Sequence, residues 1–254
     1  MSPTLLKIKA ILSFALTALC LSSNAHAGET TLAVAANFTA TAKDIAQAFE
    51  AETGHKAVLV FGSTGKLYAQ IANGAPFDAL LAADAVHPQK AEADSLAITG
   101  TRFTYAKGKI VLFSADAAVV DAAGSVLSTP EAFNKIAIAN PQTAPYGAAA
   151  VEAMTQLGVY EGLKGKIVQG DSIAQTHQFI MTQNAQLGFV AYSQVINVKT
   201  GSTWVVPETL YTPIRQDAVL LKRGENNEAA QAFLKFLQSD AARAIIISYG
   251  YGLD

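Results

Sequence analysis

The chain contains a single cysteine, Cys20, which lies in an apolar segment near the N-terminus. The remainder of the sequence can therefore form no disulfide bond, even in a compartment that would permit one. About 227 residues follow residue 27, which is enough to bury a stable core without covalent cross-links. Apolar packing must supply that core, and 51% of the residues are hydrophobic.

An excess of positive charge is also absent. The 18 Lys and Arg residues are outnumbered by 20 Asp and Glu residues, and two of the basic residues, Lys7 and Lys9, lie at the extreme N-terminus. No basic stretch remains that would bind a nucleic acid or an anionic membrane surface. If the ligand is an anion, local dipoles rather than overall charge must attract it.

The apolar N-terminal segment is too short to span a membrane. It covers residues 10–21, whereas a transmembrane helix needs about 20 apolar residues. Lys7 and Lys9 precede it and Ala25-His26-Ala27 follows it, which is the pattern of a signal peptide with its cleavage site. We expect residues 1–27 to be a signal peptide and the mature chain to be periplasmic.

Motifs for catalysis and metal binding are scarce as well. The segment Gly62-Ser63-Thr64-Gly65 lacks the G-x-S-x-G spacing of a hydrolase nucleophile. His55, His87 and His177 have no metal-ligand partner at a useful spacing. These observations favour a protein that is not an enzyme and needs no cofactor. A secreted hydrolase that uses Ser63 with His177 remains open as an alternative of a different class.

Short apolar segments alternate with helical patterns along the whole chain after residue 27. Strands are expected at residues 31–35, 57–61, 79–82, 109–113, 136–139, 167–168, 187–191 and 218–221. Helices are expected at residues 38–49, ending at Gly54, and around 67–71, 147–157, 173–184, 229–237 and 240–248. This alternation predicts the α/β class with parallel, doubly wound sheets flanked by helices. Because the pattern restarts after Gly108, we expect two lobes, residues 28–108 with 213–254, and residues 109–212.

Four turns that follow predicted strands are rich in hydrogen-bond donors. They are residues 36–39, 62–65, 143–147 and 170–173. In an open α/β sheet, ligands bind at the carboxyl ends of the strands. Each turn also precedes a helix, where free backbone N–H groups favour an anion. Taken singly, residues such as Asn37, Ser63 and Ser172 are ordinary N-cap residues, but four such turns at one cleft favour a binding site.

Several segments resemble, in order and spacing, the periplasmic molybdate-binding proteins. They include Ala35–Thr39, Gly62–Ile71, Asn73–Asp78, Ala144–Gly147 and Asp171–Ile173, and the similarity covers essentially the whole mature chain. The resemblance implies a two-lobed periplasmic-binding-protein fold of type II with an oxyanion held between the lobes. It also implies a monomeric protein whose partner is the membrane permease of an ABC importer.

The resemblance also implies which residues contact the ligand. They are Asn37, by its side chain and backbone N–H, the hydroxyl groups of Ser63 and Thr64, and the backbone N–H groups of Tyr146 and Ile173. Many relatives place a ligand-contacting tyrosine where this chain has Ala191, and Tyr192 follows one residue later. Tyr192 is therefore a further candidate.

Molybdate and tungstate suit such a site because each is a tetrahedral dianion without a proton at neutral pH, so only donors are needed. Phosphate keeps a proton near pH 7 and calls for an acceptor. The only acidic residue in the four turns is Asp171, which we expect to cap the helix that follows. Sulfate is unprotonated too, and its rejection would depend on cavity size. Sulfate, phosphate or another small anion therefore remain open as alternative ligands.

Overall fold

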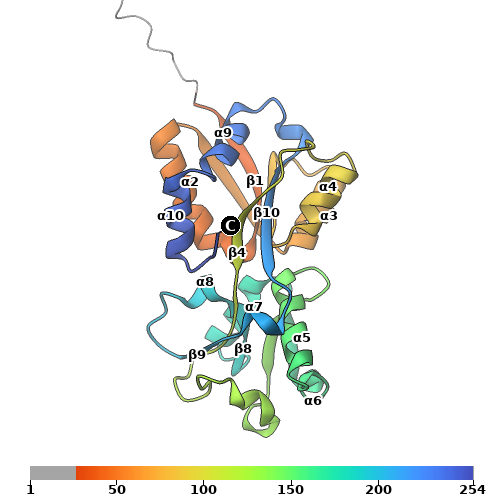
Figure 1. The fold of residues 1–254 in the computed structure, drawn as a ribbon, viewed down its shortest axis with the longest axis vertical. Coiled ribbons are helices and arrows are strands. Elements are labelled where there is room, and N and C mark those ends of the chain that lie inside the picture. Colours follow the sequence, from red (N-terminus) through yellow and green to blue (C-terminus); the bar gives the residue numbers. More distant parts are fainter. Residues whose placement is uncertain (1–26, 254) are drawn as a thin grey trace, which may run out of the picture.

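The structure is a computed structural model that describes residues 27–253. Apart from Ala27, the expected signal peptide lies outside the described residues. The chain forms two five-stranded sheets, one above the other in Figure 1. We call the upper sheet with its helices lobe I and the lower sheet with its helices lobe II.

Lobe I has the strand order β2-β1-β3-β10-β4. Its strands are β1 (Glu29–Ala35), β2 (Lys56–Gly62), β3 (Ala79–Leu81), β4 (Phe103–Gly108) and β10 (Ile214–Leu220). Its helices are α2 (Thr39–Thr53), α3 (Thr64–Ala72), α4 (Val86–Ala93), α9 (Glu228–Phe236) and α10 (Asp240–Ser248), with the 3-10 turns η1 (Ala36–Phe38) and η6 (Lys222–Gly224).

Lobe II repeats this arrangement with the order β7-β6-β8-β5-β9. Its strands are β5 (Ile110–Ser114), β6 (Ile136–Ala139), β7 (Ile167–Gly170), β8 (Leu187–Ala191) and β9 (Ser202–Val205). Its helices are α5 (Pro145–Gln156), α6 (Tyr160–Leu163), α7 (Ile173–Met181) and α8 (Tyr192–Val195). Short 3-10 turns complete the segment, namely η2 (Ser125–Ser128), η3 (Pro130–Ala132), η4 (Lys164–Lys166) and η5 (Glu208–Leu210).

The α/β class with flanking helices is confirmed, but the expectation of wholly parallel sheets is wrong. In lobe I, β10 runs antiparallel to both of its neighbours, and in lobe II β5 does the same. The reason lies in how the chain changes lobes. It passes from β4 into β5 and later returns from β9 into β10, so each lobe receives its reversed strand directly from the other lobe.

Both faces of each sheet are covered by helices. Along β1, Leu32 and Val34 pack into one core cluster with residues of α2, α9 and α10, while Ala33 packs on the opposite face with residues of α3. This alternation follows from the two-residue period of side chains along a strand. Figure 1 shows α2 and α10 on one side of the lobe I sheet and α3 and α4 on the other.

Helix α2 ends as the sequence predicts. Gly54 is its C-terminal cap and has a left-handed φ of 73°, a conformation that glycine adopts without steric cost. The sequence patterns did not reveal β4, β9 or α4. The first of these has the sequence FTYAKG, in which partly buried and fully buried residues do not alternate regularly.

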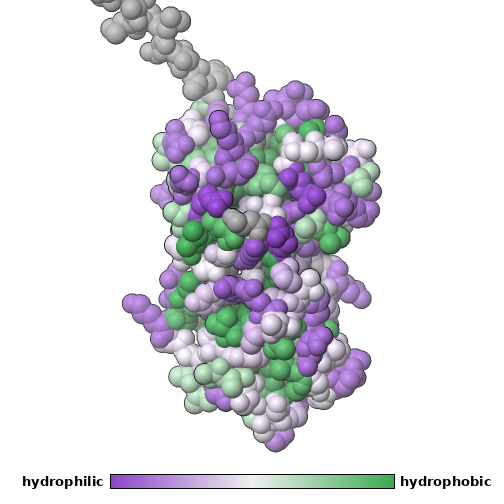
Figure 2. All heavy atoms as spheres, in the orientation of Figure 1, coloured by the Kyte–Doolittle hydropathy of each residue, from purple (hydrophilic) through white to green (hydrophobic). Residues whose placement is uncertain are grey.

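Within residues 27–253, no helix is both long enough and apolar enough to cross a bilayer. Figure 2 shows hydrophilic side chains spread over much of lobe I, with apolar side chains in scattered groups, several of them near the junction of the lobes.

Candidate ligand-binding site

All four donor-rich turns contribute to one small cavity between the lobes, the fourth through Ile173 alone. It is lined by Ala35, Ala36, Asn37, Gly62, Ser63, Thr64, Ala83, Ala144, Pro145, Tyr146 and Ile173. None of these side chains is charged. The cavity volume is about 10 Å³, close to what one water molecule occupies. Organic solutes such as sugars are too large for this space.

Ser63 and Thr64 supply two hydroxyl groups from the start of α3. Ser63 occupies the N-cap position, but its side chain makes no capping bond, and its Oγ is buried without a hydrogen-bond partner. Thr64 Oγ1 accepts a hydrogen bond from the Ala83 backbone N–H at 2.9 Å. A hydroxyl that accepts in this way still has its own proton to donate. Both residues can therefore donate to a ligand in the cavity.

Backbone N–H groups come from the first turns of two helices in lobe II. Helix α5 begins at Pro145, so Tyr146 lies in its first turn, and helix α7 begins at Ile173. The first N–H groups of a helix have no acceptor within the helix. Ser172 caps α7, because its Oγ accepts from the Gln175 N–H, and this leaves the Ile173 N–H free of the cap. The helix dipoles of α3, α5 and α7 add positive potential at the same point.

Asn37 reaches the cavity from the turn after β1, but its side-chain nitrogen bonds inward. Asn37 Nδ2 lies 2.6 Å from Gln216 Oε1, 3.0 Å from Tyr251 Oη and 3.4 Å from Tyr146 Oη. Burial raises the pKa of Tyr146 well above its ordinary value and that of Tyr251 to about 12. Neither phenol therefore carries a negative charge at neutral pH, so neither repels an anion.

The structure places Tyr192 apart from the cavity. It begins α8, and its ring lies against Gly250, where an added Cβ would be only 2.7 Å from two of its ring carbons. The ring also packs on a core cluster of lobe II. These contacts hold the ring away from the residues that line the cavity. Tyr192 is therefore not among the proposed ligand contacts.

The expected capping role of Asp171 is wrong, since Ser172 takes it. Asp171 Oδ2 instead lies 3.0 Å from Lys66 Nζ, which joins lobe II to lobe I. A second link is the hydrogen bond from the Gly65 N–H to the Thr143 carbonyl oxygen at 2.9 Å. These two contacts join the two lobes beside the cavity.

Two polar residues beside the cavity were not predicted from the sequence. Gln216 is fully buried in β10, and Tyr251 is 5% exposed in the C-terminal segment. Tyr251 Oη donates to either the Asn37 carbonyl oxygen or Ser193 Oγ, both 2.9 Å away. The only sign of Gln216 in the sequence is its place as a polar residue just before the apolar run 218–221.

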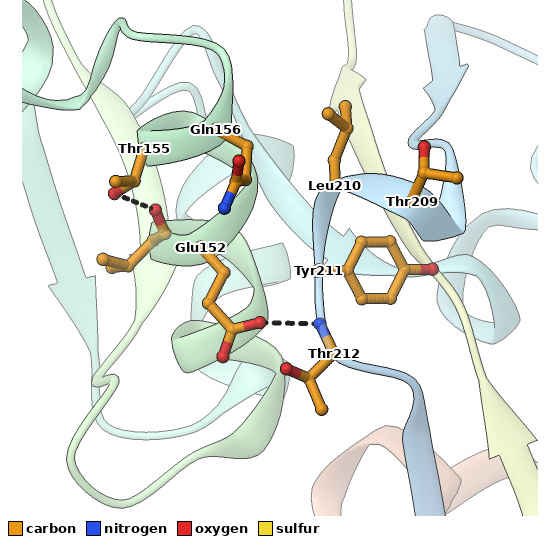
Figure 3. A pocket seen from close by; sticks show the side chains of 8 residues that line it. Glu152, Thr155, Gln156, Thr209, Leu210, Tyr211 and Thr212 are labelled. Atoms are coloured by element: carbon orange, nitrogen blue, oxygen red, sulfur yellow. Dashed lines mark hydrogen bonds between the residues drawn. The ribbon is translucent and has the colours of Figure 1, made fainter.

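A larger hollow of about 430 Å³ lies beside the segment that returns to lobe I. Figure 3 shows the Glu152 carboxylate pointing across it to the Thr212 N–H, and that hydrogen bond measures 2.6 Å. The Tyr211 hydroxyl points away from Glu152 in the same view. The Glu152 carboxylate gives this hollow a negative charge, which disfavours an anion.

The structure shows where the candidate metal-binding and catalytic residues lie among residues 27–253. No group of three or more His, Cys, Asp or Glu residues there could hold a metal ion. Ser63 Oγ and His177 Nε2 are each buried without a hydrogen-bond partner, so they do not form a nucleophile–base pair. His55 accepts from the Gly28 N–H, and His87 pairs with Asp84.

Comparison with known proteins gives consistent relatives over most of the chain. Residues 30–252 match the family described as bacterial extracellular solute-binding protein. The chain is 54% identical over 232 residues to the molybdate-binding protein ModA of Azotobacter vinelandii, which covers 90% of this chain and 92% of that protein. It is also 54% identical over 227 residues to ModA of Rhodobacter capsulatus, with 89% of each chain covered.

Solved structures agree with these sequence matches. The periplasmic molybdate-binding protein of Azotobacter vinelandii superposes with a TM-score of 0.85 at 40% identity, covering 89% of this chain and 99% of that one. The sulfate-binding protein SubI of Mycobacterium tuberculosis has a TM-score of 0.70 at 14% identity, with 88% and 86% of the two chains covered. At that identity the second match shows a common fold alone.

Proposed function

This chain belongs to the bacterial extracellular solute-binding proteins, and we propose that it captures molybdate in the periplasm as the binding component of an ABC importer. Relatives with 54% identity carry the name molybdate-binding protein. Tungstate, which has the same charge and shape, is proposed as a second ligand. The chain would deliver either ion, as a monomer, to a membrane permease, and it acts without a cofactor or catalysis.

The single observation that best supports this proposal is the buried, unpartnered hydroxyl of Ser63 in a cavity without any charged lining residue. A buried polar group without a partner is destabilising. The Ser63 hydroxyl therefore points to a ligand that accepts a hydrogen bond from it. The proposed contacts are Asn37, Ser63 and Thr64 from lobe I and the backbone N–H groups of Tyr146 and Ile173 from lobe II. All of them are donors, which suits a fully deprotonated oxyanion.

Binding would require the lobes to open and close. We propose that residues 28–108 with 213–254 form one body and residues 109–212 the other, with the β4–β5 and β9–β10 connections as the hinge. The contacts between Lys66 and Asp171 and between Gly65 and Thr143 belong to the closed form. Closure would then complete the donor shell, because lobe II supplies two of the proposed N–H groups.

A thermal-shift panel on the exported protein tests the ligand class. A ligand at a thousandfold its dissociation constant stabilises by about 4 kcal/mol, which raises Tm by roughly 8–16 °C for a chain of this size. We expect such shifts with molybdate and tungstate and little change with sulfate or phosphate. A shift with sulfate would keep the fold and change the ligand, and no shift with any of the four would contradict the proposal.

A sulfate-binding protein is the second candidate, because SubI shares the fold. Sulfate is smaller than molybdate, so the two differ in how well they reach donors on both lobes. The thermal-shift panel distinguishes a sulfate-binding protein from a molybdate-binding protein directly. A hydrolase that uses Ser63 is disfavoured, since Ser63 Oγ and His177 Nε2 are both without partners.

A further inference from the structure

Behind the cavity, Asn37 and Gln216 form a pair of buried amides. Asn37 Nδ2 donates to Gln216 Oε1 at 2.6 Å, although the two residues lie 179 positions apart in the sequence. All three hydrogen bonds of the Asn37 side chain use this nitrogen. Asn37 also lines the cavity, so in this orientation its amide oxygen is the atom left to face a ligand.

In the same arrangement the side-chain N–H groups of Gln216 lack an acceptor. Gln216 is 0% exposed, and its Nε2 is buried without a hydrogen-bond partner. Orphaned buried N–H groups are rare, whereas a carbonyl oxygen with a free lone pair is tolerated more often. A half-turn of both amides about their last bonds exchanges oxygen and nitrogen at nearly the same positions. Gln216 Nε2 then donates to Asn37 Oδ1, and one orphaned N–H gains an acceptor.

The half-turn has a direct consequence for an anion. It brings Asn37 Nδ2 to the cavity side, where the amide can donate to an oxyanion instead of presenting an oxygen to it. The Tyr146 hydroxyl can donate to Asn37 Oδ1 as readily as it accepts from Nδ2. Tyr251 has one proton, so donating it to Asn37 Oδ1 gives up its bond to the Asn37 carbonyl oxygen, which still accepts from Ser193 Oγ at 3.1 Å. Both tyrosines can therefore accommodate the change. Their raised pKa values keep both hydroxyls protonated at neutral pH.

We propose that Gln216 is a positioning residue for the ligand: its amide N–H holds Asn37 Oδ1 and thereby directs Asn37 Nδ2 at the bound oxyanion. This inference rests on the proposed function. Gln216 itself lies outside the lining of the cavity, so it acts only through Asn37. An irregularity in β10, where the register shifts between Gln216 and Asp217, lies at this point of the strand.

The test is a double-mutant cycle with molybdate as the probe, measured by isothermal titration calorimetry on the full exported protein. Asn37→Ala removes the proposed donor, and Gln216→Met removes the amide that orients it at similar size. We expect Asn37→Ala to lower affinity about 10- to 150-fold, as for loss of a hydrogen bond to a charged group. We expect Gln216→Met to lower it several-fold in the native background and less than about twofold beside Asn37→Ala.

Gln216→Glu is the second variant, in case Gln216→Met disturbs folding. When ionised its carboxylate can only accept, so it holds Asn37 Nδ2 inward, and affinity must fall further in the native background than beside Asn37→Ala. Direct repulsion of the dianion by the new charge would act equally in both backgrounds. Thermal unfolding of each ligand-free variant reports on the fold separately.

The outcomes distinguish this inference from the proposed function. If the native protein binds molybdate and both Gln216 variants lose the same factor with and without Asn37, the positioning role is overturned while the function stands. If the native protein does not bind molybdate, the proposed function fails and this inference fails with it. Loss of the Gln216 effect beside Asn37→Ala supports both.

Discussion

Lys66 Nζ lies 3.0 Å from Asp171 Oδ2, and the two side chains belong to opposite lobes. Both are well exposed, at 46% and 73%, so water and salt screen the pair and it contributes little to affinity. Its position over the closed cleft nevertheless gives it a role in keeping the lobes together. Lys66 also attracts an incoming anion and Asp171 repels it, and these effects oppose each other.

We therefore expect Lys66→Met and Asp171→Asn to be coupled in ligand dissociation. The coupling should be about 0.2–1 kcal/mol, or about 1.4- to 5-fold in the dissociation rate constant of molybdate. Stopped-flow displacement for the four members of the cycle measures it. The coupling should shrink in 0.5 M salt, which is the control for its electrostatic origin. Strict additivity at low salt would show that the pair does not hold the cleft closed.

Ser63→Ala and Thr64→Val make a matched pair of hydroxyl deletions. Each should lower molybdate affinity by about 1.5–3 kcal/mol, the contribution of a hydrogen bond to a charged group. Their effects on the ligand-free protein should differ. Ser63 Oγ has no partner, so its removal should leave the free energy of unfolding unchanged or slightly raised. Thr64 Oγ1 accepts from the Ala83 N–H, so its removal should cost about 1–3 kcal/mol.

Calorimetric titration and urea unfolding measure the two quantities. Equal destabilisation of both ligand-free variants would contradict the assignment of Ser63 as the unpartnered hydroxyl. Unchanged affinity in Ser63→Ala would remove Ser63 from the proposed ligand contacts.

Gly65→Ala should affect the stability of the ligand-free protein and the closure of its lobes in opposite directions. Gly65 lies inside helix α3, where alanine is favoured over glycine by about 0.5–1 kcal/mol. An added Cβ, however, would lie 3.1 Å from Thr143 Cα and 3.2 Å from its carbonyl oxygen on the other lobe. That distance is too short for comfortable packing, so the substitution should raise the Tm of the ligand-free protein and lower molybdate affinity.

Gly162→Ala is the control for that experiment. Gly162 also lies in a helix, α6, and an added Cβ there meets nothing within 4 Å. It should raise stability without any change in affinity. If both variants bind molybdate equally well, the contact between Gly65 and Thr143 does not belong to the ligand-bound form.

Local sequence predicted the parts of the site that depend on local structure. Ser63, Thr64, Tyr146 and Ile173 follow strand ends and begin helices, and strand-to-helix turns can be recognised from a few neighbouring residues. All four line one cavity, and their contact with a ligand stays a prediction. The expectation for Tyr192 rested on a position one residue away. Ala191 ends β8 and Tyr192 begins α8, and the two pack against different core clusters.

The polar residues behind the site could not be predicted in this way. Asn37 meets Gln216 and Tyr251 across 179 and 214 positions of sequence, and no local pattern encodes such contacts. The same holds for the antiparallel direction of β10. It is set by the return of the chain from lobe II, and its first residues, Ile214–Asp217, are too polar to read as a core strand.

Tyr251 should make the protein sensitive to alkaline pH. Burial raises its pKa from the ordinary 10.0 to about 12. Below pH 10 the phenol is protonated in both folded and unfolded chains, so its contribution does not vary with pH. Between pH 10 and 12 the unfolded chain loses the proton while the folded chain keeps it, and folding stability falls by about 1.4 kcal/mol per pH unit.

Tyr251→Phe removes this titration. At pH 8 the variant should be less stable than the native protein by about 0.5–1.5 kcal/mol, because the hydrogen bonds to Asn37 and Ser193 are lost. The difference should shrink as the pH rises through 10, and the two curves should approach or cross near pH 11. Urea unfolding followed by circular dichroism from pH 8 to 11.5 measures both curves. Parallel curves would mean that Tyr251 ionises as easily in the folded chain as in the unfolded one, which burial in this core should prevent.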